Sequence, residues 1–299
     1  MPTHAALAIV YEHPEWFKPL FTALDRRGLE YVALPFQDHQ FDLADQRAPA
    51  PVVFSRLAMS SFLRQDEHPI FYAQALYAHW ELNGAHIING SKALAIDANK
   101  ARQLSVIQSL GLDIPATRVV HRQADIIAAT TGLRWPVIVK VNIGGSGAGV
   151  SRYDTMEALQ QAVADGTTPR GIDSVLLRME TETLNGKYLY AISLNTDGGT
   201  FDLCPADVCL IDKPTVTVQA FEPDDYTIHA AEAIARASGL DIGGIEFMVD
   251  DRDGVSRFYD INGLSNFVAD PLNVLGWDPH EKLVDYLFDT IVSTREIAA

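Results

Sequence analysis

The position of Lys140 suggests chemistry more clearly than that of any other residue. It ends the apolar run 135–140, and a glycine-rich loop follows at once. Glycines let several backbone N–H groups approach one anion, since no side chain blocks them. A lysine beside such a loop adds a positive charge that suits phosphate. This stretch therefore predicts a polyphosphate-binding loop, with Gly144, Gly145, Ser146, Gly147 and Gly149 as its candidate contacts.

The order of the elements separates this loop from two common nucleotide-binding motifs. A Walker loop places its lysine after the glycines, and both it and the dinucleotide fingerprint lead into a helix. Here Lys140 precedes glycines spaced as G-x-G-x-G, and residues 150–153 favour a second strand. We expect a hairpin whose tip folds over a nucleotide. The alternative is a glycine-rich surface hairpin that binds nothing.

Two carboxylates and an amide near the C-terminus could hold a hard cation. Glu246 lies in one expected strand, and Asp260 and Asn262 lie two residues apart in the next, so the latter two share a face. If the strands pair about the turn at 250–254, Glu246 lies opposite them. Three oxygen ligands suit Mg²⁺. The alternative is that they are exposed polar positions of a half-solvated sheet.

The elements that must position these residues follow from hydrophobic period and turn signals. Over residues 1–95, strands alternate with helices, which predicts a small parallel sheet covered by helices. The strands expected there are Leu7–Tyr11, Tyr31–Leu34, Val52–Ser55 and His86–Ile88, and the helices are Trp16–Arg27 and Ile70–Leu82.

A turn-rich stretch at 166–171 is the expected boundary within the remaining chain, so we predict domains at 1–95, 96–170 and 171–299. In the middle domain we expect helices at Asn99–Leu110, Asp125–Thr130 and Met156–Ala164, and a strand at Pro115–Val120 besides the glycine hairpin. In the last domain we expect strands at Ser174–Met179, Lys187–Leu194, Val216–Val218, Ile245–Val249 and Phe258–Ile261, and helices at Ile228–Ser238 and Glu281–Val292.

Composition excludes several classes of protein. The chain has 299 residues, of which 47% are hydrophobic, so it folds around real cores. Its net charge of −16 repels phosphate backbones and argues against nucleic acid as the main partner. No apolar run reaches about 18 residues, and the first residues lack a signal peptide, so we expect no membrane and a cytoplasmic location. Cys204 and Cys209 fit a reducing compartment, as two buried thiols.

Taken together, these residues resemble the ATP-grasp superfamily over roughly residues 89–275. The segments 88–90, 97–100 and 110–117 are similar to the start of the ATP-grasp region, and 136–149 is similar to its second-lysine strand and mobile loop. Phe54-Ser55-Arg56 is similar to the glutamate-ligase (RimK-like) branch, which modifies ribosomal proteins and small peptides. The resemblance implies an α/β (α+β) ATP-grasp fold with an N-terminal parallel-sheet pre-ATP-grasp domain.

The resemblance also implies site roles. Lys100 would be the first ATP lysine and Lys140 the contact to the α- and β-phosphates, with the glycine loop over the triphosphate. Glu246, Asp260 and Asn262 stand where the superfamily places its magnesium ligands, with Mn²⁺ as the alternative cation. For the ribose hydroxyls the candidates are Glu180 and Glu182, and for an arginine that some members carry they are Arg178 and Lys187.

This chain departs from the usual metal motif, which is Glu-x-Asn followed by Pro-Gly. Asp260 replaces that Glu, and Glu246 replaces a usual Asp, so both carboxylates are kept with changed arm lengths. Ser265-Asn266 stands where Pro-Gly is common, which implies a different acceptor pocket.

The implied activity is that of an ATP-dependent carboxylate–amine ligase acting through an acyl phosphate, with ATP and Mg²⁺ as cofactors. Its substrates would be a small-molecule or peptide carboxylate and amine. The alternatives are an ATP-binding regulatory module of the same fold and a phosphotransferase. Arg56 either steers a substrate by a bidentate contact or is a helix-capping or surface arginine. A homodimer is the default assembly.

Overall fold

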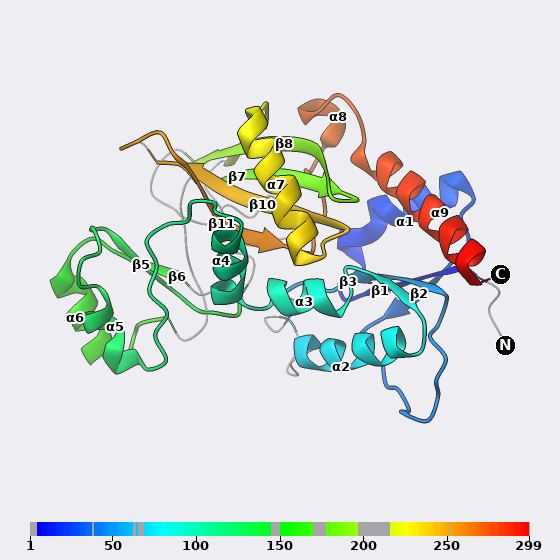
Figure 1. Cartoon of the computed structure of the whole chain (residues 1–299), viewed down its shortest axis with the longest axis horizontal. Coiled ribbons are helices and arrows are strands. Elements are labelled where there is room, and N and C mark those ends of the chain that lie inside the picture. Colours follow the sequence, from blue (N-terminus) through cyan, green and yellow to red (C-terminus); the bar gives the residue numbers. More distant parts are fainter. Residues whose placement is uncertain are drawn as a thin grey trace.

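The computed structural model describes residues 5–37, 39–61, 64, 69–144, 150–169, 178–196, 216–250 and 252–298. Within these ranges the chain forms three sheets that follow one another along the sequence (Figure 1). The first has four strands, the second two and the third five. Cys204 and Cys209 lie outside the described residues.

The first sheet is parallel and has the strand order β2-β1-β3-β4. Its strands are β1 (Leu7–Tyr11), β2 (Tyr31–Pro35), β3 (Val52–Arg56) and β4 (His86–Ile88). β1 is an unbroken apolar run, as a strand covered on both faces requires. Leu7 and Ile9 pack in one core with α1 (Lys18–Arg27) and α9 (Pro279–Ala298), whereas Ala8 and Val10 pack with α2 (Pro69–Leu82).

The second sheet is the expected glycine hairpin, an antiparallel pair of β5 (Val137–Lys140) and β6 (Val150–Tyr153). A small core holds it against α5 (Ile126–Ala129) and α6 (Met156–Ala164), with Leu159 fully buried. Figure 1 shows this unit at one end of the molecule's long axis. Because a strand follows the loop, the Walker and dinucleotide arrangements are excluded.

The third sheet is antiparallel and has the strand order β11-β10-β7-β8-β9. Its strands are β7 (Arg178–Leu184), β8 (Lys187–Thr196), β9 (Val216–Phe221), β10 (Ile242–Val249) and β11 (Ser256–Asn262). α7 (Asp225–Ser238) lies across one face (Figure 1), and α4 (Lys100–Ser109) adds Ile107 to the same core. Residues of β8 and β10 on the other face join the core of α1 and α9.

The described residues confirm every expected strand and helix they contain except one. Residues 115–120 form no strand, and Val119 is 72% exposed. Strand-forming residues need a neighbouring strand for their backbone hydrogen bonds, and none in the described structure pairs with this segment. The domain boundaries at residues 95 and 170 stay predictions. The part of the expected strand Ser174–Met179 that precedes Arg178 lies outside the described residues and also stays a prediction.

Two short helices escaped the sequence analysis, α3 (Ser91–Asp97) and α8 (Pro271–Val274). The N-terminus of α3 is capped from α2, because the Ser91 N–H donates to Glu81 Oε1 at 2.8 Å. A helix whose cap comes from another element lacks the local signal that sequence analysis uses.

Asn89 joins the first sheet to the third. It follows β4 in a left-handed conformation (φ 53°) and is 4% exposed. Its Nδ2 donates to the carbonyls of Ile242 and Gly263 at 2.6 and 2.5 Å, and its Oδ1 accepts from the N–H groups of Asp241 and Ile242 at 2.9 and 3.2 Å.

We predict that Asn89→Ala lowers the free energy of unfolding by about 3 kcal/mol, because it leaves buried carbonyl and N–H groups without partners. Urea unfolding of both proteins measures this. Asn273→Ala, which changes an exposed asparagine, is the control and should cost less than about 0.5 kcal/mol. An equal loss in the two variants would contradict the bracing role.

Candidate active site

The two predicted ATP lysines meet at one strand, although they come from different elements. Lys100 begins α4, and its Nζ contacts Oδ1 of Asp260 on β11. Lys140 ends β5, and its Nζ lies 5.8 Å from the ring centroid of Tyr259, the preceding residue of β11. The side chains of Lys100 and Asp260 are only 12% and 15% exposed. The structure thus gathers two cations around one segment of β11.

The two predicted carboxylate ligands face each other across β10 and β11. Glu246 is the register partner of Asp260, so both side chains lie on one face of the sheet. Asn262 Nδ2 donates to Glu246 Oε1, which brings the third predicted ligand to the same place. The expected pairing about the turn at 250–254 is therefore confirmed. Gly243 permits it, because a Cβ there would lie 2.4 Å from the Asn262 carbonyl oxygen.

Burial and opposite charges act against each other on the lysines. Burial alone would lower the pKa of Lys100, but Asp260 and Asp97 outweigh it, so its pKa is raised. The pKa of Lys140 is lowered, chiefly by burial, while Asp260 and Glu246 oppose that change. Both lysines therefore sense the carboxylates of β10 and β11.

Asp97 is a third carboxylate in this place, and the sequence analysis gave it no role. It ends α3, is 5% exposed, and its Oδ2 accepts from the Gly263 N–H at 2.9 Å. Burial raises its pKa to about 7, with Asp260 and Glu246 adding to the rise and Lys100 opposing it. Its signal in the sequence was its position three residues before Lys100.

Two asparagines hold the N-terminus of α4, and they fix the position of Lys100, its first residue. Asn99 Oδ1 caps the helix by accepting from the Arg102 N–H at 2.9 Å. Asn142 accepts from the Lys100 N–H with its carbonyl at 2.9 Å and from the Ala101 N–H with Oδ1 at 2.8 Å. Since Asn142 lies two residues beyond Lys140, this contact ties the start of the glycine loop to the helix that carries Lys100.

Of the predicted loop contacts, only Gly144 lies among the described residues, and it is buried. The others, Gly145, Ser146, Gly147 and Gly149, lie outside them. Lys140 pairs with Val150, so the loop does connect the two strands of the hairpin.

The two ribose candidates lie on β7, next to the metal candidates. Glu180 is the register partner of Glu246, and Glu182 is the partner of Gly244. Glu182 is 3% exposed and accepts from Ser265 Oγ at 2.6 Å. Arg178 pairs in register with Leu194. The alternative to it, Lys187, lies at the exposed hairpin end, where its Nζ contacts Glu232 Oε2 at 3.2 Å.

Arg56 is neither a surface residue nor a helix cap, because it is only 3% exposed at the end of β3. Its Nη2 donates to the Ser265 carbonyl and to Asn266 Oδ1, the latter at 3.0 Å. The rings of Phe17 and Phe54 lie 4.9 and 5.0 Å from its guanidinium carbon. Burial lowers its pKa to about 9, against the opposing charge of Glu182.

Two guanidinium nitrogens of Arg56, Nε and Nη1, have no hydrogen-bond partner among the described residues. Arg56 also lies at the carboxyl end of β3, beside β1, where the strand order turns from β2 on one side to β3 on the other. In open parallel sheets this crevice is the usual place for ligands. The arrangement leaves a buried cation with two unused donors near this edge of the sheet.

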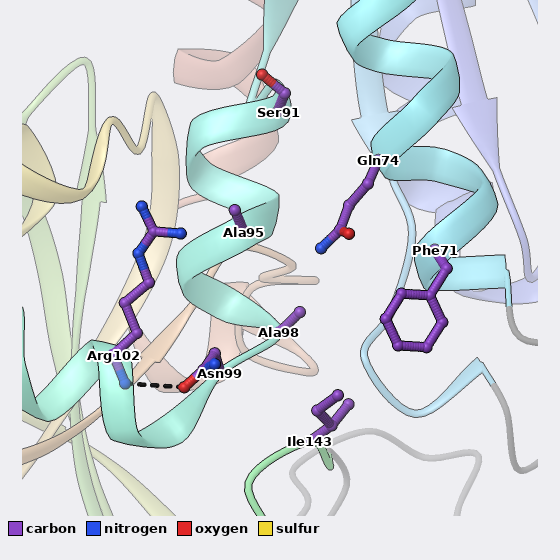
Figure 2. Close-up of a pocket in the computed structure, with 8 residues that line it drawn as sticks. All are labelled: Phe71, Gln74, Ser91, Ala95, Ala98, Asn99, Arg102 and Ile143. Atoms are coloured by element: carbon purple, nitrogen blue, oxygen red, sulfur yellow. Dashed lines mark hydrogen bonds between the residues drawn. The ribbon is translucent and has the colours of Figure 1, made fainter.

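A separate cavity of about 420 Å³ lies between α2 and α3 (Figure 2). Phe71 and Gln74 line it from α2, opposite Ala95 and Ala98 on and after α3. The Arg102 guanidinium points away from Phe71 in this view. None of the predicted site residues lines the cavity, so it is distinct from the lysine–carboxylate cluster.

Comparison with known proteins gives partial sequence matches and full-length structural ones. No family model matches the chain. It is 29% identical over 113 residues to the ribosomal protein bS6–L-glutamate ligase of Shigella boydii serotype 4, a match that spans 37% of this chain and about a third (36%) of that relative.

Two solved structures are similar over nearly the whole chain. The ATP-grasp ligase PsnB complexed with a minimal precursor has a TM-score of 0.70 at 16% identity, covering 97% of this chain and 99% of that one. The D-alanine–D-alanine ligase of Bacillus anthracis complexed with ATP has a TM-score of 0.66 at 16% identity, covering 99% and 100%.

We predict that Asp97→Asn removes a pH dependence of stability in the metal-free protein. The pKa of Asp97 is about 7 when folded and near 3.9 when unfolded. Its stabilising contribution is therefore complete below pH 4 and is lost as the pH rises through 7. Between pH 5 and pH 7 wild type should lose about 2 kcal/mol relative to the variant.

Denaturant unfolding in EDTA at several pH values measures this difference. Asp289→Asn, at an exposed position of α9, should run parallel to wild type. Parallel curves for wild type and Asp97→Asn would show that the carboxyl is already ionised at pH 5.

Proposed function

We propose that this chain, which has the ATP-grasp fold, is an ATP-dependent ligase that joins a carboxylate to an amine. The expected fold class, with an N-terminal parallel sheet, is confirmed. One observation carries the proposal: Lys100 and Lys140 converge from separate elements on β11, beside the paired carboxylates Glu246 and Asp260. Two cations beside two carboxylates suit a triphosphate bound with a divalent cation.

In this proposal, Lys140 and the glycine loop bind the phosphates of ATP, and Lys100 adds a second positive charge. Glu180 and Glu182 remain the candidates for the ribose hydroxyls. The contact of Glu182 with Ser265 and its charge near Arg56 support a role for it beside the carboxylate substrate, and we propose Glu180 for the ribose. Arg178, two residues before Glu180 in β7, is proposed to contact the phosphates.

The chemistry of the oxygen donors fits Mg²⁺. No group of three or more His, Cys, Asp or Glu side chains in the described ranges could hold a metal. The proposed ligands are therefore Glu246, Asp260 and the amide of Asn262, with further oxygens from ATP, as Mg²⁺ commonly takes. Bound there, the ion would neutralise charge on the phosphates. Mn²⁺ offers the same preference for oxygen.

The reaction needs no nucleophile from the protein. The substrate carboxylate attacks the γ-phosphorus, which gives an acyl phosphate and ADP. The amine then attacks the acyl carbon, loses a proton and expels phosphate, which leaves an amide bond. Carboxylate and triphosphate repel each other, so the protein's task is to supply positive charge, and Lys100 and Lys140 do this. Burial keeps their charges weakly screened.

Arg56 is the proposed anchor for a substrate carboxylate. Its Nε and Nη1, which have no hydrogen-bond partner among the described residues, can each donate to an oxygen of the substrate, and their burial would make such charge-assisted contacts strong. Two of the similar proteins are named for L-glutamate with ribosomal protein bS6 and for D-alanine, and the ligase PsnB is also described in complex with a precursor peptide. We therefore propose an amino acid or peptide as each substrate, with ATP drawn from the cytoplasm. The homodimer stays a prediction.

We predict that hydroxylamine traps an acyl phosphate as a hydroxamate when the protein is given ATP, Mg²⁺ and amino-acid or peptide carboxylates. Asp260→Asn should reduce hydroxamate formation about 100-fold, because it removes one of the two carboxylates proposed to hold the metal ion. Asp253→Asn, on the exposed turn of the same hairpin, is the matched control and should keep wild-type activity.

The alternatives give different results in this assay. A phosphotransferase would consume ATP without forming hydroxamate. A regulatory module would bind ATP but would release no phosphate with any pair of carboxylate and amine.

We predict that Arg56→Lys raises the KM for the carboxylate substrate about 30-fold and leaves the KM for ATP within about 2-fold, because one ammonium group cannot replace the separately directed Nε and Nη1 donors. Arg122→Lys, at an exposed pair with Asp125, is the control. Steady-state kinetics with each substrate varied in turn measures both constants. A rise confined to the KM for ATP would place Arg56 outside the carboxylate site.

A further inference from the structure

Among the residues that the structure describes, a side chain and not another strand closes the outer edge of β11. β11 is the edge strand of the third sheet, and its inner neighbour is β10. On the outer side, Gln103 Nε2 donates to the Ile261 carbonyl at 2.9 Å, and the Ile261 N–H donates to Gln103 Oε1 at 3.1 Å. One primary amide thus makes both hydrogen bonds that a neighbouring strand would make to Ile261, whose N–H it shares with Asp260 Oδ1 at 2.9 Å.

Ile261 lies between the two proposed metal ligands of β11, Asp260 and Asn262. Successive residues of an antiparallel strand direct their backbone groups to opposite sides. Gln103 therefore holds the outer side of β11 at the residue whose two neighbours carry the metal-binding side chains. Any shift of the strand at Ile261 would move both of them.

Gln103 also orients the helix that carries Lys100. The two residues are three positions apart on α4, so their side chains lie on the same face, toward β11. Lys100 contacts Asp260 while Gln103 contacts Ile261, so the helix is attached to consecutive residues of one strand. A second bond from Gln103 Nε2, to the Asp97 carbonyl at 2.9 Å, ties in the end of α3.

The Gln103 side chain is 0% exposed, and its amide uses both hydrogens and its oxygen. A leucine or methionine would fill such a core position without the cost of burying an amide. The hydrogen bonds of the Gln103 amide offset this cost, and they define the position of α4 against β11 more closely than packing alone would.

We propose that Gln103 is a positioning residue, which sets Lys100 against Asp260 and Asn262 and so aligns one of the two proposed ATP lysines with the proposed metal ligands. This inference rests on the proposed ligase function. Gln103 itself touches neither nucleotide nor substrate in this proposal.

The test compares Gln103→Met, which keeps the length of the side chain and removes its three hydrogen bonds, with Gln103→Glu, which keeps the acceptor for the Ile261 N–H. The matched control is Gln108→Met, on the exposed side of the same helix. We expect Gln103→Met to lower kcat for hydroxamate formation at least 10-fold and to raise the half-saturating Mg²⁺ concentration at least 5-fold. Nucleotide affinity by calorimetry without Mg²⁺ should stay within 3-fold.

Gln103→Glu should show an intermediate loss of kcat, and Gln108→Met should match wild type. In the metal-free protein, hydrogen exchange of the Ile261 N–H, followed by NMR, should accelerate at least 10-fold in Gln103→Met and not in Gln108→Met. If Gln103→Met does not fold, Gln103→Glu carries the comparison.

The outcomes separate this inference from the function on which it rests. If wild type forms hydroxamate and both Gln103 variants keep its kcat and its Mg²⁺ dependence, the positioning role is overturned and the ligase function stands. Wild-type protein that binds ATP but forms no hydroxamate with any carboxylate overturns the ligase itself. Equal losses in kcat and in metal-free nucleotide affinity would reveal general loosening of the core, which also overturns the positioning role.

Discussion

The candidate site depends on opposite charges that are held together away from water. Lys100 contacts Asp260 where both side chains are largely buried, and Glu246 and Lys140 lie in the same electrostatic environment. Removing charges from water is costly unless each one finds a partner. The carboxylates keep Lys100 charged, while Lys100 opposes the burial that raises the pKa of Asp97. A triphosphate with its cation would enter a site that already contains both signs.

Such a cluster requires that α4, β5 and β11 keep their relative positions. Asn142 attaches the start of the glycine loop to the first amides of α4, and Gln103 attaches the same helix to the edge of β11. Asn89 braces the first sheet against β10, and Arg56 reaches across to Ser265. The contacts of Gln103, Asn89 and Arg56 use buried polar groups whose loss would leave partners unsatisfied, so geometry and stability depend on the same residues.

Local patterns predicted much of this arrangement, and their failures have physical causes. The apolar run of β1 and the turn-flanked helices predicted the parallel sheet, and the glycines after Lys140 predicted a hairpin. Residues 115–120 have strand-forming composition, but no strand of the described structure lies beside them, and a ladder needs two strands. α3 was missed because Glu81, on another helix, supplies its N-terminal cap.

By itself, the sequence determined which side chains carry charge, which face of a strand each occupies, and that Glu246 meets Asp260 across a short turn. Period and turn chemistry act over a few residues, so neighbouring strands can be paired from them. Only the tertiary structure decided that Lys100 contacts Asp260, 160 residues away, that Arg56 is buried against Ser265, and that Gln103 closes the edge at Ile261. These contacts depend on how separately formed cores pack together, and no local pattern encodes that packing.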